Sequence, residues 1–183
     1  MIQYSEQIRK RLWPHDSGRD VYVILDGARD RRMYGYVIDT YLDSACLYSG
    51  ALPPALEMAA PYLVQLEHDD RLTRRLMEEG WGKSWGIYLK CPKSLKELRR
   101  HLRGFLVVVD SSGKRLAFRY YDPRVLRVYL PTCTASELRT VFGPIETFWT
   151  EGQDPETLLE FSFDGRKLVQ TAVPLNRAAL EPS

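Results

Sequence analysis

The sequence has few of the residues that build metal centres or disulfide frameworks. It holds three cysteines and three histidines among 183 residues. Cys46, Cys91 and Cys133 are odd in number and far apart, which favours reduced thiols in a reducing compartment. No pair of His or Cys residues stands at a metal-ligand spacing. We therefore expect no metal site and no cofactor.

Long apolar runs are also missing. Polar residues between Gln3 and Gln7 interrupt the N-terminal segment, so no signal peptide is predicted. A run such as Phe105–Val109 falls far short of the length that spans a bilayer. The net charge is only +2, which indicates neither a nucleic-acid nor a membrane partner. We expect a soluble cytoplasmic protein without a small-molecule substrate.

Strand and helix patterns alternate along the chain. Two capping boxes, Ser94 with Glu97 and Thr134 with Glu137, mark the starts of two helices. Apolar spacing and turn residues predict the remaining elements. The predicted helices begin near residues 5, 33, 54, 70, 94 and 134, and the predicted strands cover 20–25, 45–48, 62–66, 85–90, 107–109 and 116–121.

The tail carries a hairpin signal, because Asp164-Gly165 separates two short β-rich runs. The pattern predicts an α/β fold, with α+β as the alternative: a mixed β-sheet flanked by helices, followed by a C-terminal β-hairpin. We divide the chain into an N-terminal helix and linker (1–19), a main domain (20–150), and an acidic segment with the hairpin and a loose tail (151–183).

One stretch resembles a catalytic motif without its context. Gly82-Lys83-Ser84-Trp85-Gly86 matches the G-x-S-x-G nucleophile elbow, which needs a strand before the serine and a helix after it. Here a helix precedes and a strand follows, and the possible bases His15, His68 and His101 belong to no local motif. Gly82-Lys83-Ser84 also ends like a phosphate loop, but Met77 stands where that loop requires glycine. We interpret the stretch as a helix-to-strand turn.

Charge is segregated along the chain. Residues 93–127 contain ten basic and three acidic residues, whereas residues 151–164 contain five acidic residues and no basic one. On the helix that starts at Ser94, the basic residues lie away from the leucines. They are Lys96, Arg99, Arg100 and Arg103. This side is either a solvated face or a docking surface for an acidic protein segment or nucleic acid. A third alternative is that the basic segment 93–127 and the acidic segment 151–164 face each other within the fold.

The densest polar and aromatic cluster is Arg119-Tyr120-Tyr121-Asp122-Pro123-Arg124. In a strand, Arg119 and Tyr121 would share one face and Tyr120 would lie on the other. An arginine inside an apolar strand needs a partner, and the candidates are Asp122 and Asp26, with His101 as a possible third member. The cluster is either a structural ion pair or the centre of a partner-binding patch.

Several short segments, taken in order, resemble a known family. They are Leu25-Asp26-Gly27-Ala28, Leu47–Gly50, Ala60–Val64, Gly80-Trp81-Gly82, Trp85-Gly86-Ile87, Leu98–Arg103, Phe118–Leu126, Leu130-Pro131-Thr132 and Phe142-Gly143-Pro144. The chain resembles the effector-adaptor chaperones of bacterial type VI secretion, the TEC family, which was first catalogued as a domain of unknown function. The resemblance covers residues 20 to 150.

This resemblance implies a non-enzymatic protein that binds a toxic type VI effector in the cytoplasm and helps to load it onto the spike protein VgrG. The family has no catalytic residues to transfer. We therefore select candidate protein-binding residues and motif residues with structural roles. The first set is Arg99, Arg100, Arg103, Arg119, Tyr121, Arg124 and Trp81; the second is Asp26, His101, Asp122 and Pro123.

Two other functions stay as alternatives. A serine hydrolase would use Ser84 and needs a histidine within hydrogen-bond reach of it. A nucleic-acid-binding module would use the basic residues of 93–127, although the sequence contains no known recognition module. The near-neutral total charge argues against the second alternative.

Overall fold

Strand β1 (Val21–Asp26) is an interior strand of the main sheet, and all six of its residues are buried. The computed structural model describes residues 4–15, 20–109 and 112–175. Val21, Val23 and Leu25 join one apolar core, whereas Tyr22 and Ile24 join a second core on the opposite face. A strand covered on both faces has a continuous apolar sequence, as the first of the predicted strands does.

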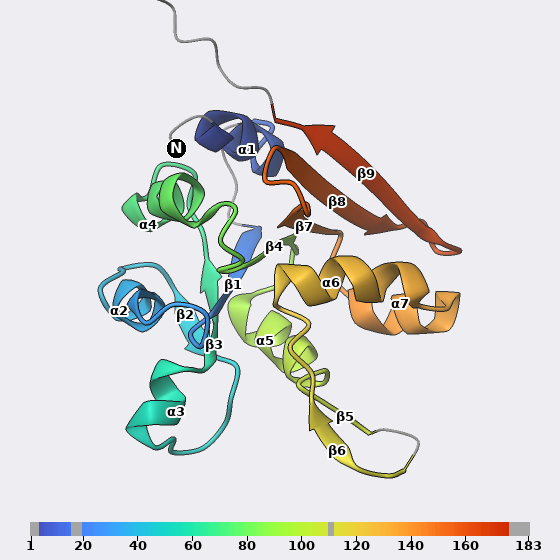
Figure 1. Cartoon of the computed structure of the whole chain (residues 1–183), viewed down its shortest axis with the longest axis horizontal. Coiled ribbons are helices and arrows are strands. Elements are labelled where there is room, and N and C mark those ends of the chain that lie inside the picture. Colours follow the sequence, from blue (N-terminus) through green and yellow to red (C-terminus); the bar gives the residue numbers. More distant parts are fainter. Residues whose placement is uncertain (1–3, 16–19, 110–111, 176–183) are drawn as a thin grey trace, which may run out of the picture.

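The main sheet contains seven strands in the order β2-β3-β1-β4-β7-β8-β9 (Figure 1). The other strands are β2 (Ser44–Cys46), β3 (Pro61–Gln65), β4 (Gly86–Lys90), β7 (Thr147–Glu151), β8 (Thr157–Phe163) and β9 (Leu168–Pro174). Every pairing between these described strands is antiparallel. The predicted fold, a sheet with flanking helices and a C-terminal hairpin, is confirmed in its α+β form, but the sheet is antiparallel where a mixed one was predicted.

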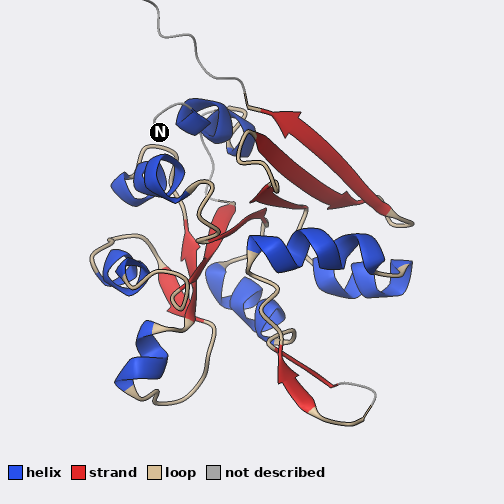
Figure 2. Ribbon diagram, viewed as in Figure 1, coloured by secondary structure: helices blue, strands red, loops and turns tan. Residues whose placement is uncertain are grey.

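Helices cover both faces of the sheet, as Figure 2 shows. The first layer contains α1 (Ser5–Leu12), α2 (Arg32–Ile38), α4 (Arg71–Arg75) and the π-helical turn η2 (Leu76–Gly80). The second contains α5 (Leu95–Arg103), α6 (Pro123–Tyr129), the 3-10 turn η3 (Leu130–Thr132) and α7 (Ala135–Phe142). The short helix α3 (Pro54–Met58) has no buried residue and lies at the lower left of Figure 1.

The spacing of apolar residues decides which side of each helix meets the sheet. Leu98 and Leu102 of α5 are four residues apart, and both are buried in the second core. Replacing either leucine with alanine would cost about 2–5 kcal/mol of stability, because the packed core cannot collapse around the missing atoms. Both predicted capping boxes, at Ser94 and Thr134, are present.

A separate two-stranded sheet projects from the end of α5. Its strands are β5 (Val107–Val109) and β6 (Arg115–Ala117), and we name this hairpin the arm (Figure 1). The prediction of a strand over 116–121 is wrong beyond Ala117. Residues 119–121 form a turn before α6, and both Tyr120 and Tyr121 are buried. Alternation between two faces therefore does not apply to them.

Two elements were missed by the sequence analysis. Helix α6 begins with Asp122 as its N-cap and Pro123 at its first position, a start signal that stands in the sequence. Strand β7 follows the Gly143-Pro144 break and is buried from Phe148 to Glu151. Its Glu151 is an acid in a buried strand, which the apolar pattern does not reveal.

Some predictions fall on parts of the chain outside the described residues. These are residues 16–19 of the linker, residue 111 of the turn between β5 and β6, and the tail after residue 175. The segmentation at residue 150 stays a prediction. In space, β8 and β9 extend the same sheet as the strands of the 20–150 segment.

Candidate functional site

The end of β1 carries a buried carboxylate paired with an arginine from the family-like motif. Asp26 is fully buried, and its Oδ2 accepts a hydrogen bond from Nη2 of Arg119. Its Oδ1 accepts from the backbone N–H of Ala28 at 3.1 Å. The bond to Asp26 raises the pKa of Arg119. Of the candidate partners of Arg119, the structure selects Asp26.

A second pair stands at the start of α6. The Asp122 carboxylate accepts from the backbone N–H of Arg124 at 2.9 Å and from its Nη2 at 2.6 Å. Burial acts to raise the pKa of Asp122, but the hydrogen bonds from Arg124 outweigh it and lower that pKa. The structure thus places Asp122 as a helix cap, with Pro123 buried beside it. Both acids are buried, and the side chains of Arg119 and Arg124 are 44% and 49% exposed.

His101 does not join this group, so the expectation of a third member is corrected. Its Nε2 lies 2.9 Å from the carbonyl oxygen of Val141, and its ring packs edge-on against Phe105. The backbone of Gly143 approaches the same ring so closely that a Cβ there would collide with it. His101 connects α5 to the end of α7.

Two of the candidate contact residues are inside the molecule. Tyr121 is 2% exposed, and burial raises the pKa of its hydroxyl. Trp81 is 8% exposed, and its indole N–H donates to the carbonyl of Pro155 at 2.8 Å. The prediction that these two residues contact a partner is therefore corrected, because a buried ring packs within the fold and is not accessible to a partner.

Ser84 lies in a turn between η2 and β4, as the sequence predicts, and it has a positive φ of 56°. Its hydroxyl donates to Glu151 at 3.0 Å, and the backbone N–H groups of Gly82 and Ser84 donate to the same carboxylate at 2.7 and 2.9 Å. Burial raises the pKa of Glu151. The hydrogen-bond partner of the Ser84 hydroxyl is thus a carboxylate. The three hydrogen bonds to Glu151 hold the turn against β7.

The basic residues of α5 lie together on one side of the helix, as predicted. We name this side the basic face, and its residues are Lys96, Arg99, Arg100 and Arg103. With Gly104 they line an open hollow with a volume of about 430 Å³. Among the described residues, four cationic side chains and no acidic one line this hollow.

Arg99 has a further role in the fold. Its Nε and Nη2 donate to the carbonyl oxygens of Cys46 and Tyr48, at 2.7 and 3.0 Å. These carbonyls belong to the end of β2 and the loop after it, so Arg99 ties α5 to the edge of the main sheet.

The alternative in which the basic and the acidic segments face each other applies to Arg124 and Arg127, which interact electrostatically with Glu151. Nη1 of Arg127 donates to the carbonyl of Gly152 at 3.0 Å. Glu160 instead pairs with Arg11 of α1 and accepts from the indole of Trp149. The negative charge of Glu160 therefore neutralises Arg11 and not the basic face.

The arm next to the basic face exposes apolar side chains on both of its surfaces. The exposed residues are Val107 (42%), Val108 (40%), Val109 (65%) and Leu116 (39%). Val108 pairs with Leu116 across the strands, whereas Val107 and Val109 point to the other surface. The base of the arm is held by aromatic contacts between Phe105 and Tyr120 and between Phe118 and Tyr129.

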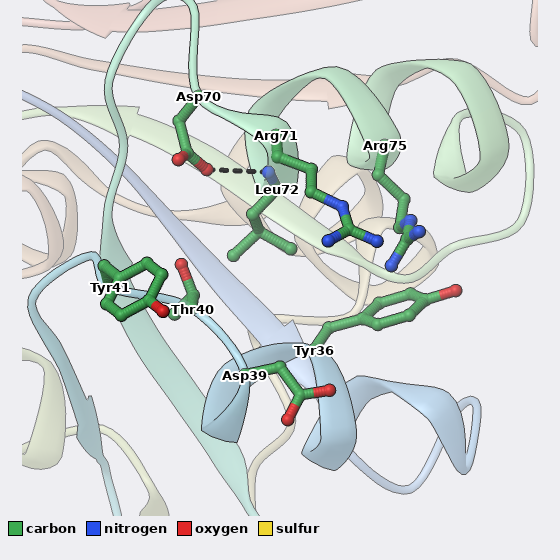
Figure 3. Close-up of a pocket in the computed structure, with 8 residues that line it drawn as sticks. All are labelled: Tyr36, Asp39, Thr40, Tyr41, Asp70, Arg71, Leu72 and Arg75. Carbon is green, nitrogen blue, oxygen red and sulfur yellow. Dashed lines mark hydrogen bonds between the residues drawn. The ribbon is translucent and has the colours of Figure 1, made fainter.

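A pocket between the end of α2 and the start of α4 was not found by the sequence analysis. It has a volume of about 210 Å³ and is lined by Tyr36, Asp39, Thr40, Tyr41, Asp70, Arg71, Leu72 and Arg75 (Figure 3). The Asp70 carboxylate caps α4 through the N–H of Leu72, and the Arg75 guanidinium stacks on the Tyr36 ring. Asp70 and Arg75 therefore have structural roles. The lining residues are scattered along the sequence, so no continuous motif marks this pocket.

Among residues 4–15, 20–109 and 112–175, no group of three or more His, Cys, Asp or Glu side chains could hold a metal ion. No helix in this part of the chain is both long and apolar enough to cross a bilayer.

Together these features describe an α+β domain with two ion pairs whose acids are buried, a basic hollow and a projecting apolar arm. The family described as a domain of unknown function, DUF4123, matches residues 21–140. Because the match covers most of the 183 residues, the chain belongs to this family. No curated protein and no solved structure matches the chain.

Proposed function

We propose that the protein is a non-enzymatic adaptor chaperone that binds a type VI secretion effector in the cytoplasm and helps to load it onto the VgrG spike. The resemblance of the ordered motifs to the effector-adaptor chaperones supports this, and membership of the DUF4123 family is consistent with it. The structural observation that carries the proposal is the arm.

The arm is built as a contact element. An isolated two-stranded hairpin is marginally stable in water, and exposed apolar side chains on both surfaces add nothing to its stability there. A partner that covered these side chains would remove apolar area from water and gain on the order of 1 kcal/mol for each. An apolar projection next to charged residues is typical of a surface that binds another polypeptide.

Co-purification tests the proposal. The tagged protein is expressed together with the effector and the VgrG protein encoded beside it, and each is quantified in the purified complex. We expect both partners to be retained. A protein that retains neither, under conditions where it is folded and monodisperse, contradicts the proposed function.

A paired variant tests the arm. Val108→Asp with Leu116→Asp places two charges on one surface of the arm, far from the buried core. We expect at least roughly tenfold less effector or spike in the complex, because the charges lose hydration on contact. The control is Val128→Asp on α6, which is 66% exposed and replaces an apolar side chain outside the arm. Equal retention by both variants would show that the arm is not a contact element.

A further inference from the structure

The basic face gathers four cationic side chains, none of which forms an ion pair with an acid in the described residues, whereas six arginines elsewhere do. Arg9, Arg11, Arg32, Arg75, Arg119 and Arg124 each form an ion pair with an Asp or Glu. Within the described residues, Lys96, Arg100 and Arg103 form neither a hydrogen bond nor an ion pair through their side chains.

The cations also stand where they repel one another. Lys96 and Arg100 are four residues apart, as are Arg99 and Arg103, so each pair lies on neighbouring turns. Like charges at this spacing destabilise a helix. The helix dipole favours cations only in the last turn, which accounts for Arg100 and Arg103 but not for Lys96 or Arg99. Glu97, three residues before Arg100, offsets part of this repulsion, but Lys96, Arg100 and Arg103 form no ion pair in the described residues.

The helix nevertheless holds these groups in place. A capping box closes the N-terminus of α5, Leu98 and Leu102 are buried, and Arg99 is bound to the carbonyls of Cys46 and Tyr48. The cationic groups thus surround a hollow on a rigid element, and little conformational entropy of the backbone is lost when an anion enters.

We propose that the basic face binds an acidic segment of a client polypeptide, with Asp or Glu carboxylates in the hollow and apolar side chains against the arm. The assignment of the partner as a client rests on the proposed function. Guanidinium groups bind carboxylates through paired hydrogen bonds, so Arg100 and Arg103 supply the directional contacts and Lys96 supplies charge.

A protein segment fits this surface better than nucleic acid does. The arm begins directly after α5, since the N–H of Leu106 bonds to the carbonyl of Arg103. Its valines offer contacts to apolar side chains, whereas a sugar-phosphate backbone has no apolar group to place there. The α5 helix has nine residues and extends only about 14 Å, which is short for a track along a nucleic-acid backbone.

Fluorescence anisotropy with defined probes tests the proposal. The first probe is a labelled peptide of about eight residues that alternates glutamate with leucine, long enough to cross the hollow and reach the arm. The second is the same peptide with glutamine in place of glutamate, and the third is a labelled oligothymidine of similar length. We expect the acidic peptide to bind at least roughly tenfold more tightly than either other probe, and less tightly at higher salt.

Charge reversal locates the site. Arg100→Glu with Arg103→Glu should weaken binding of the acidic peptide at least roughly tenfold. The control, Arg74→Glu with Arg166→Glu, changes the net charge equally at exposed positions outside the basic face. Equal weakening by both variants, or tighter binding of oligothymidine than of the acidic peptide, overturns the proposal.

The same variants separate this proposal from the proposed function. If the effector co-purifies with the Arg100/Arg103 variant as well as with the wild type, the acidic-segment proposal fails and the adaptor function stands. If the peptide binds the wild type at the basic face but neither effector nor spike co-purifies, the adaptor function fails and the face remains a site for acidic peptides.

Discussion

Asp26 and Arg119, 93 residues apart in the chain, form an ion pair in which the acid is fully buried and the arginine side chain is 44% exposed. The pair joins the end of β1 to the turn between β6 and α6. It therefore connects an interior strand of the sheet to the segment that follows the arm.

The first prediction concerns the strength of this connection. Asp26→Asn leaves the Arg119 guanidinium without its counter-charge, and we expect a loss of about 1–3 kcal/mol in the free energy of unfolding. This loss is smaller than the usual loss for a fully buried ion pair, because water reaches the Arg119 side chain. Urea unfolding of the wild type and of Asp26→Asn measures the difference.

A matched substitution provides the control. Asp30→Asn removes an acid that pairs with Arg32 at 2.8 Å near the surface. Its expected cost is at most about 1 kcal/mol. If Asp26→Asn costs no more than Asp30→Asn, the ion pair of β1 does not stabilise the fold in the way we describe.

The second prediction separates the residues of the basic face by their roles. Arg99→Ala should lower the free energy of unfolding by about 1–3 kcal/mol, because the carbonyls of Cys46 and Tyr48 lose a charged donor. Arg100→Ala should change it by no more than about 0.5 kcal/mol, since this side chain contacts no partner in the described residues.

Thermal unfolding of the two variants tests this difference. An equal and large loss in both would mean that the whole basic face serves the fold. An unchanged stability in Arg99→Ala would mean that the two hydrogen bonds to the β2 end are not needed to hold α5.

The third prediction is a pH dependence with a defined sign. The pKa of Glu151 is raised above 4.5 in the folded protein by burial. Its contribution to stability is therefore greatest below pH 4.5 and is lost as the pH rises toward the folded-state pKa. The stability of the wild type relative to Glu151→Gln should fall over this interval.

Glu97 gives the opposite sign and serves as the internal control. Hydrogen bonds from Ser94 lower the pKa of Glu97, so its contribution is present above pH 4.5 and is lost as the pH falls through the folded-state pKa. Urea unfolding of the wild type, Glu151→Gln and Glu97→Gln across this pH range measures both slopes. Slopes of the same sign for the two variants would contradict the assignments.

Local signals predicted much of the fold. The two capping boxes, the leucine spacing of α5 and the Asp164-Gly165 turn each fall where the structure has a helix start, a buried face or a hairpin. These features depend on residues a few positions apart, so the sequence contains all the necessary information.

The prediction failed where long-range packing decides the conformation. Tyr120 and Tyr121 have high β propensity, yet both are buried in a turn, because the Asp122–Pro123 helix start bends the chain there. The selection of Trp81 and Tyr121 as contact residues failed for a similar reason. Aromatic residues suit both a core and an interface, and only burial distinguishes them.

The sequence by itself determined most of the elements, the cluster of basic residues on one side of a leucine-faced helix, and the ordered motifs of the family. Only the tertiary structure decided which charges are neutralised. Asp26 reaches Arg119 and Glu160 reaches Arg11 through contacts between distant segments, whereas Arg100 and Arg103 form no ion pair with an acid in the described residues. Charge is a property of each residue, but its neutralisation depends on distances of a few ångströms that the fold sets.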